Sequence, residues 1–188
     1  MVKADCGGCN GCSRCCHGMG NSIILDPYDV YRMTTGMGKS MQELLAASVE
    51  LNVVDGVILP NLKMQGTEEA CAYLDEEGRC SIHPYRPGIC RLFPLGRYYE
   101  NGGFSYFLQT GECAKENRSK IKVSKWIDTP DLTRNQQFTL QWHDLLHAME
   151  ERLTGEDEGK QREENLLLLR LFYLLPYEGT IDFYTQFT

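Results

Sequence analysis

Five of the nine cysteines fall within the short stretch CGGCNGCSRCC, at positions 6 to 16. Cys9, Cys12 and Cys15 are separated by two residues each, and Cys16 follows directly. Two intervening residues form a tight turn, so successive thiolates can converge on one metal ion. The same C-x2-C-x2-C order holds three corners of a 4Fe–4S cube in bacterial-type ferredoxins. The spacing therefore indicates a metal centre and leaves the choice between iron and zinc open.

The remaining cysteines have the same character. Cys71 and Cys80 flank a predicted hairpin, Cys90 lies in HPYRPGICRLFP, and Cys113 lies in TGEC. None of the four falls on an apolar periodic face, where a buried thiol would only fill space. Without Cys6, eight cysteines remain, which is the number that completes two four-thiolate centres. A four-cysteine cube beside a separate mononuclear site fits the count equally well.

A few further residues could join a metal site. Cys6 forms a second C-x2-C pair with the next cysteine, and His17 directly follows the cluster, where it could replace one thiolate. His143 and His147 lie four residues apart on one face of a predicted helix, a spacing that can bind zinc. Ordinary packing explains that pair more simply. His83 is expected to form a hydrogen bond within its own turn.

Composition and charge narrow the class of protein. The chain has 188 residues, 42% hydrophobic and 24% charged, as in soluble globular proteins. Its most apolar window, LLLLRLFYLL, is too short to span a bilayer, and the N-terminus has no apolar run. We therefore expect a cytoplasmic protein without a membrane partner, in which reduced thiols serve a metal or catalysis more often than disulfides. The net charge of −7, without a basic stripe, argues against nucleic acid as a partner.

The chain divides into three zones. Residues up to about 22 are rich in Gly and Cys and have no hydrophobic periodicity, so packing alone cannot fix their shape. Short helices and hairpins are predicted to about residue 125, and long helices follow. We expect an α+β fold in which an irregular, cysteine-rich, metal-ordered core with short hairpins packs against a C-terminal antiparallel helix pair. Residues 1–125 would form the metal-binding domain and residues 126–188 a helical extension, together one compact unit.

Local signals define the expected helices. DPYDVYRMTTG begins with Asp26 as N-cap and Pro27 as the first helical residue, and Gly36 is the expected stop. SMQELLAAS has Ser40 and Glu43 at capping-box spacing. Two long helices are expected in LTRNQQFTLQWHDLLHAMEERLTG and in KQREENLLLLRLFYLLPYEG, the second ended by its proline.

Short strands are expected between these helices. VILPNLKM has the composition of a strand. ACAYL and CSIH would pair around the turn DEEG, and GRYYE and FSYFLQ would pair around NGG. The sequence therefore predicts two hairpins, of which the first is flanked by Cys71 and Cys80.

Three segments together resemble a known family. CNGCSRCC, then CAYLDEEGRCSIHPYRPGICRLFP, then a late cysteine in GEC are similar to the CxxCxxCC zinc- or iron-chelating domain, also called YkgJ-like, over roughly residues 9 to 115. Arg86 and Arg91 match its RP and CR-x-x-P elements, and an arginine beside a metal site can offset thiolate charge. By position, the resemblance implies as ligands Cys9, Cys12, Cys15, Cys16, Cys71, Cys80, Cys90 and Cys113.

Three functions follow from these patterns. The leading hypothesis is a metal-binding protein that holds an iron–sulfur cluster, preferably 4Fe–4S, or zinc through eight cysteines. The second is a cluster-dependent enzyme, since one branch of the family resembles flagellin lysine N-methylases that use S-adenosylmethionine. The sequence lacks a Gly-rich strand-turn-helix fingerprint for such a cofactor. The third is a metal-handling or adaptor protein that presents its helical face to a protein partner, which labile metal and a bare apolar patch would favour.

Overall fold

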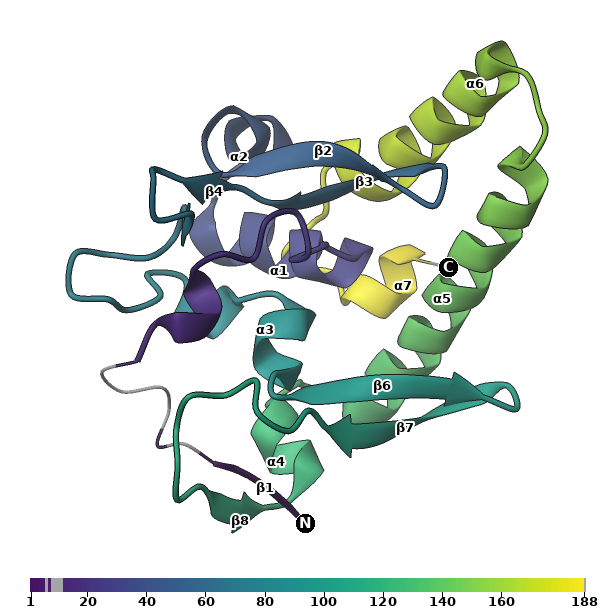
Figure 1. Ribbon diagram of the computed structural model, residues 1–188. Coiled ribbons are helices and arrows are strands. Elements are labelled where there is room, and N and C mark those ends of the chain that lie inside the picture. The colour runs from purple at the N-terminus through teal and green to yellow at the C-terminus, as the bar shows by residue number, and fades with distance from the viewer. Residues whose placement is uncertain (6, 8–11, 188) are drawn as a thin grey trace.

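The computed structural model covers the whole chain, and the structure describes residues 1–5, 7 and 12–187. Its helices are α1 (Pro27–Met37), α2 (Met41–Ala47), α3 (Gly88–Leu92), α4 (Val123–Ile127), α5 (Leu132–Leu153), α6 (Glu158–Leu169) and α7 (Phe183–Phe187). Its strands are β1 (Val2–Asp5), β2 (Val49–Val54), β3 (Val57–Leu62), β4 (Met64–Gln65), β5 (Ala70–Cys71), β6 (Leu95–Glu100), β7 (Gly103–Leu108) and β8 (Ser119–Ile121). The predicted α+β class is confirmed (Figure 1).

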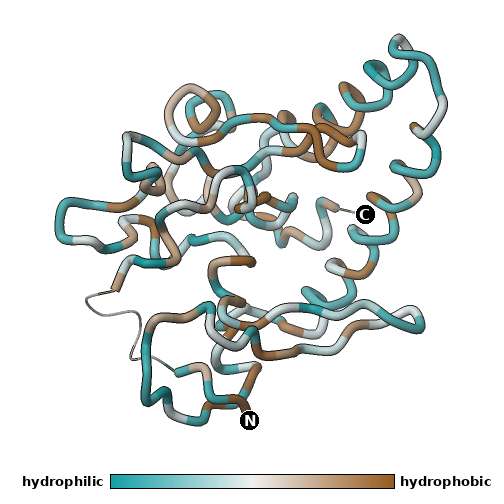
Figure 2. The backbone as a smooth tube through the Cα atoms, viewed as in Figure 1, coloured by the Kyte–Doolittle hydropathy of each residue, from teal (hydrophilic) through white to brown (hydrophobic). Residues whose placement is uncertain are grey.

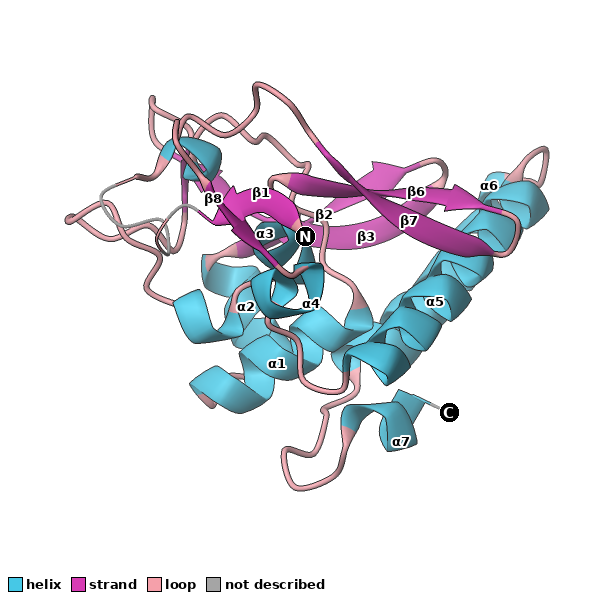
Figure 3. Ribbon diagram, turned by 90° about the horizontal axis from the view of Figure 1, so that it is seen from below, coloured by secondary structure: helices cyan, strands magenta, loops and turns pink. Residues whose placement is uncertain are grey.

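The strands form separate antiparallel pairs. β1 pairs with β8, β2 with β3, β4 with β5, and β6 with β7. Figure 3 shows the β2–β3 and β6–β7 hairpins toward one side of the molecule and α1, α2 and α7 toward the other. Such small strand pairs are marginal alone and need packing against helices for stability. The hairpins therefore depend on the helices around them.

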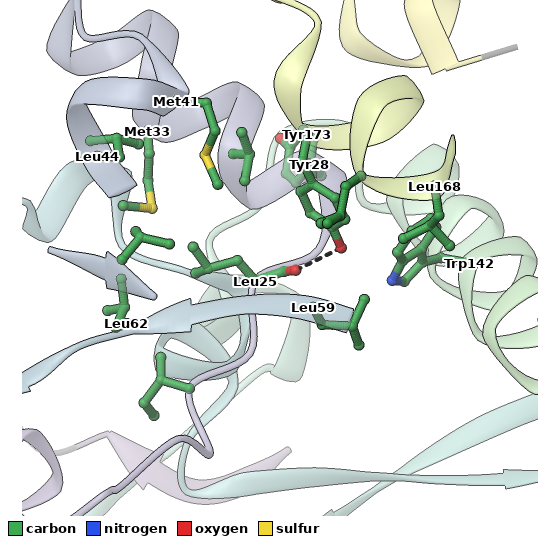
Figure 4. Packing of buried hydrophobic residues seen from close by; sticks show 14 of the residues in the cluster. Leu25, Tyr28, Met33, Met41, Leu44, Leu59, Leu62, Trp142, Leu168 and Tyr173 are labelled. Carbon is green, nitrogen blue, oxygen red and sulfur yellow. Dashed lines mark hydrogen bonds between the residues drawn. The ribbon is translucent and has the colours of Figure 1, made fainter. Parts of the chain in front are cut away.

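The largest hydrophobic core draws on both halves of the sequence. From the first half it includes Leu25, just before α1, Met33 of α1 and Leu62 of β3. From the second half it includes Phe138 of α5 and Tyr173, which follows α6. All five side chains are almost fully buried. Figure 4 shows the Tyr173 hydroxyl, which donates a hydrogen bond of 3.0 Å to the Leu25 carbonyl oxygen. Core packing therefore orders the middle of the chain.

The first two predicted helices form where their capping residues stand. Asp26 and Ser40 each accept a hydrogen bond from the backbone three residues later, so both capping boxes are present. The expected stop at Gly36 is wrong, because α1 continues to Met37 and ends with Gly38 in the left-handed conformation, at φ 64°. Gly36 lies inside the helix, where a Cβ would overlap the ring of Tyr85. Packing against Tyr85, and not the end of the helix, explains why position 36 is a glycine.

One predicted hairpin forms and the other does not. β6 and β7 pair around Asn101 and Gly102, as the NGG turn predicts. The strand expected at CSIH is wrong: Cys80 only forms an isolated bridge with Leu74, and a 3-10 turn follows over His83–Tyr85. β5 pairs with β4 instead. The pairing around Cys80 is limited to its bridge with Leu74, in which the Ser81 N–H donates to the Tyr73 carbonyl at 2.8 Å.

The C-terminal helices run in opposite directions and diverge from their connecting loop (Figure 1). An ion pair between Arg152 and Glu164 joins them near that loop, and both helices contact β3. After α6 the chain makes a π-helical turn over Arg170–Leu174 before Pro176. In the described part of the chain, no helix combines the length and the apolar character needed to cross a membrane.

Candidate metal centre

Six described cysteines line one cavity of about 210 Å³. They come from three separate stretches of the chain, around residues 12–16, 71–80 and 90. By volume the cavity would hold on the order of ten waters. The six thiols are those of Cys12, Cys15, Cys16, Cys71, Cys80 and Cys90.

Backbone hydrogen bonds bring the first stretch to the cavity. A 3-10 turn over Arg14–Cys16 is closed by the Cys16 N–H, which donates to the Ser13 carbonyl at 2.8 Å. Just beyond it, the Gly18 N–H donates to the Glu69 carbonyl at 2.9 Å, and His17 forms an isolated bridge with Ala70. These contacts set the turn beside β5, where Cys71 stands.

The second stretch is a loop closed on itself. The Arg79 N–H donates to Asp75 Oδ1 at 2.7 Å, and the Asp75 N–H donates to the Arg79 carbonyl at 2.8 Å. The Leu74 N–H also donates to the Cys71 carbonyl at 2.9 Å. The loop returns Cys80 toward Cys71, so both thiols reach the same cavity although no regular hairpin forms.

The third stretch is α3, a short helix between α1 and the β6–β7 hairpin (Figure 1). Cys90 lies in its middle and lines the cavity, whereas the next residue, Arg91, points away from it. The Arg91 guanidinium lies 3.7 Å from Asp29 of α1 and over the ring of Tyr28. Arg91 therefore supports α3 from behind and does not border the cavity.

The two neighbouring thiols share a hydrogen bond. The Cys16 thiol donates to Cys15, which lowers the pKa of Cys15 to about 6, with a smaller contribution from the positive charge of Arg86. The same hydrogen bond, together with burial, raises the pKa of Cys16. The hydrogen bond therefore favours one thiolate in the pair, on Cys15, and the thiolate is the form that binds a metal.

Burial dominates at the other thiols. It raises the pKa of Cys71, Cys80 and Cys90, because a thiolate loses solvation inside the protein. At Cys90 the negative charge of Asp29 adds to this effect. A bound cation reverses such a preference, since a coordinating thiol is deprotonated. The surroundings of these three thiols thus disfavour free thiolates and would favour thiolates that share a metal.

Cationic side chains border the thiols. Arg79 and Arg86 line the cavity, as does His83. Arg86 donates from Nη1 to His83 Nε2 at 2.8 Å, and burial, followed by the charge of Arg86, lowers the pKa of that histidine. The hydrogen bond expected for His83 within its own turn thus forms, with Arg86. Arg86 also opposes the rise in the pKa of Cys80, so its charge acts on the thiols directly.

The other candidate ligands lie elsewhere. Cys113 lines a smaller adjoining cavity of about 20 Å³ together with Cys12 and Cys15. His17 directs Nδ1 to the Ser13 carbonyl at 3.0 Å and is not among the described residues that line the larger cavity. Cys6 and Cys9 lie outside the described residues.

The two histidines of α5 contact other side chains and not the described cysteines. His143 stacks on the ring of Tyr99 at 3.8 Å between centroids. His147 lies 3.6 Å from Glu151, and both of these side chains are exposed. Neither histidine lines the cysteine cavity. The simpler interpretation of the pair, as packing and surface contacts, agrees with this geometry.

Sequence reasoning missed the apolar part of the cavity wall. Met19, Ile23, Phe93 and Trp126 line it beside the thiols. The Trp126 indole N–H donates to the Leu92 carbonyl at 3.1 Å, which fixes α4 against the end of α3. No local sequence pattern predicts that these residues line the cavity, because their common surface forms only when segments far apart in the sequence pack together.

The donor set suits a soft metal. Thiolates select zinc and iron–sulfur clusters among biological metals, and hard cations prefer oxygen ligands. Among the described residues, no three Cys, His, Asp or Glu side chains are arranged around a common point as ligands would be. The six thiols instead line one shared cavity. The residues therefore fit a thiolate-bound metal in their chemistry and their shared location.

The comparison with known proteins agrees with this chemistry. The family model CxxCxxCC, described as "Putative zinc- or iron-chelating domain", matches residues 8–121, which is more than half of the chain. No curated protein and no solved structure shows significant similarity to the chain. The protein therefore belongs to the CxxCxxCC family of zinc- or iron-chelating domains.

Proposed function

We propose that this protein is a metal-binding protein whose cavity thiols hold an iron–sulfur cluster, preferably of the 4Fe–4S type, with zinc as the alternative. One observation carries the proposal: six thiols from three separate stretches of the chain line a single cavity. Structural cysteines that merely fill space have no reason to gather in this way. A cytoplasmic location, which belongs to this proposal, would keep these thiols reduced and available for metal.

The size of the cavity supports the preference for a cluster. A lone zinc ion bonds directly to four thiolates at about 2.3 Å and would leave most of the cavity of about 210 Å³ unfilled. A cluster of several iron and sulfide atoms occupies such space, and the C-x2-C-x2-C spacing suits three of its corners. When bound, a cluster would supply one-electron transfer, whereas zinc held by four thiolates would stabilise the fold.

Residues of the cavity would have different roles in binding the metal. Cys15 would provide the first thiolate, because its hydrogen bond from Cys16 already favours that form. Arg86 would offset the negative charge of the thiolates from the cavity wall. The ligands would come from the six cavity cysteines and, by their sequence spacing and position beside the cavity, from Cys9 and Cys113.

The test is the metal content of protein purified without oxygen, read with its visible absorption spectrum. Several irons and sulfides per chain with a brown colour support the cluster, and one or two zincs without colour support the alternative. Cys90→Ser should lower the metal content, whereas the control His147→Ala, on the exposed face of α5, should leave it unchanged. Wild-type protein with little metal and freely titrating thiols would contradict the proposal.

A second candidate function is metal handling, with the helical half presented to a protein partner. Its support is a run of leucines in and after α6 that are about one-third to one-half exposed: Leu166, Leu167, Leu171, Leu174 and Leu175. Figure 2 shows α6 changing from hydrophilic at its start to hydrophobic toward its end. Exposed apolar patches of this kind often mark contact surfaces. Rapid loss of metal to a chelator would favour metal handling, and slow loss would favour a resident centre.

The methylase-like function has no comparable support. Its expected feature is a cleft between the C-terminal helix pair and the cysteine region. None of the described residues that line the cysteine cavity comes from α5 or α6. Binding of S-adenosylmethionine to the metal-loaded protein, measured by calorimetry, would revive this function.

A further inference from the structure

Asp29 connects α1 to the helix that carries Cys90. The Asp29 side chain is almost completely buried, and its Oδ1 accepts a hydrogen bond of 2.6 Å from the Gly88 N–H, at the start of α3. The same oxygen lies 3.7 Å from the Arg91 guanidinium. Asp29 thus contacts the residues two before and one after Cys90, although it lies about sixty positions earlier in the chain.

α3 needs this support because it is too short to be stable by itself. It spans five residues, and isolated helices of that length are unstable in water. Its own N-cap residue, Pro87, makes no capping hydrogen bond through its side chain. Asp29 supplies the missing acceptor from another helix.

The contact also satisfies a buried charge. Arg91 is 4% exposed, and in the described structure its Nε and Nη1 atoms have no hydrogen-bond partner. A guanidinium buried in this way is costly without an anion nearby, and breaking such a pair by removing one partner is strongly destabilising. Asp29 is the carboxylate within ion-pair distance of Arg91. The position of Arg91, and of Cys90 beside it, is therefore tied to Asp29.

We propose that Asp29 is a positioning residue of the metal centre: by capping α3 and pairing with Arg91, it sets where the Cys90 thiol stands on the cavity wall. This inference rests on the proposed metal-binding function. Asp29 does not line the cavity and is not a ligand. It acts through α3, as residues beyond the ligands commonly orient the ligands of a metal.

Asp26 provides a matched control. It belongs to the same capping box, where its Oδ1 accepts a hydrogen bond of 2.8 Å from the Asp29 N–H. Among the described residues it makes no hydrogen bond or ion pair with α3, so Asp26→Asn removes a neighbouring buried carboxyl and leaves the Asp29 contacts with Gly88 and Arg91 in place. Asp29→Asn keeps an oxygen for Gly88 but removes the charge that faces Arg91. Asp29→Ala removes both.

The experiment measures Zn²⁺ affinity by competition with a chelator and records the thiolate absorption band of bound Co²⁺. We expect Asp29→Ala to weaken Zn²⁺ binding about 10- to 100-fold, with Asp29→Asn intermediate and Asp26→Asn near wild type. The Co²⁺ band should shift in both Asp29 variants, because the geometry at Cys90 changes. A general loss of stability would not shift that band. The variant Asn165→Ala tests this directly, because it removes a buried side chain of α6 that hydrogen-bonds to the β2–β3 turn.

The outcomes separate the two proposals. If wild-type protein binds Zn²⁺ and both Asp29 variants bind it equally well with an unshifted Co²⁺ band, the positioning role is wrong and metal binding stands. Equal losses in Asp26→Asn and Asp29→Asn would also refute it, since they would indicate only damage to α1. If Asp29→Ala does not fold, the comparison of the two asparagine variants decides. Wild-type protein that binds neither Zn²⁺ nor Co²⁺ and holds no iron–sulfur cluster when purified without oxygen refutes both proposals.

Discussion

Tyr173→Phe removes one atom from the centre of the hydrophobic core. Tyr173 follows α6 and is 1% exposed, and its hydroxyl donates to the carbonyl oxygen of Leu25, just before α1, at 3.0 Å (Figure 4). The two residues lie 148 positions apart. The substitution keeps the ring and its packing, so it isolates a hydrogen bond that joins the C-terminal half to the segment leading from the cysteine cluster.

The expected loss follows from the burial of both partners. A typical hydrogen bond contributes about 0.5–1.5 kcal/mol net, and an acceptor left buried without a partner costs about 1–3 kcal/mol. We expect Tyr173→Phe to lower the free energy of unfolding by about 1–2 kcal/mol. For a chain of this size that corresponds to a decrease of about 2–8 °C in the melting temperature.

Thermal unfolding, followed by far-ultraviolet circular dichroism of protein in one metal state, measures this loss. The control is Tyr98→Phe, because Tyr98 is 60% exposed and its hydroxyl can bond to water. If residues 1–125 and 126–188 form one unit, as we propose, Tyr173→Phe should lower a single transition. An unchanged melting temperature would refute the argument from the buried hydrogen bond, and two transitions of which only one shifts would refute the single unit.

Three further predictions concern packing, pH and metal. Gly36→Ala should destabilise the protein by about 1–3 kcal/mol, because a Cβ there would overlap the Tyr85 ring; a stabilising result in urea denaturation, as helix propensity alone predicts, would contradict this. Burial, followed by the charge of Asp29, raises the pKa of Asp26 in the folded protein to about 7. Between about pH 4 and 7 the folded protein therefore keeps a proton on Asp26 that the unfolded chain has lost, and stability decreases as the pH rises through that window. Asp26→Asn should therefore stabilise the protein more at about pH 8 than at about pH 5, and an equal effect at both would exclude this titration. Chelation of metal should expose residues 12–22 to protease before α5 and α6, and simultaneous cleavage of all three regions would argue against metal-coupled folding of the first zone.

The sequence by itself determined the features that depend on near neighbours. The capping boxes at Asp26 and Ser40 were predictable because a side chain three residues from an N–H either carries the right oxygen or does not. The β6–β7 hairpin followed from its Asn-Gly turn, which adopts positive φ angles easily. The C-x2-C-x2-C spacing indicated a metal centre for the same reason, since a tight turn brings its own thiols together.

Only the tertiary structure decided how the distant parts meet. That Cys71, Cys80 and Cys90 share a cavity with the first cluster depends on backbone contacts between segments far apart in sequence. The sequence misplaced the end of α1 at Gly36, because this glycine is required by the Tyr85 ring packed against it and not by the end of the helix. Asp29 completes the capping box in the first turn of α1, yet it also caps α3. Local hydrogen bonds are encoded by adjacent residues, whereas these contacts arise only when many segments bury their apolar surfaces together.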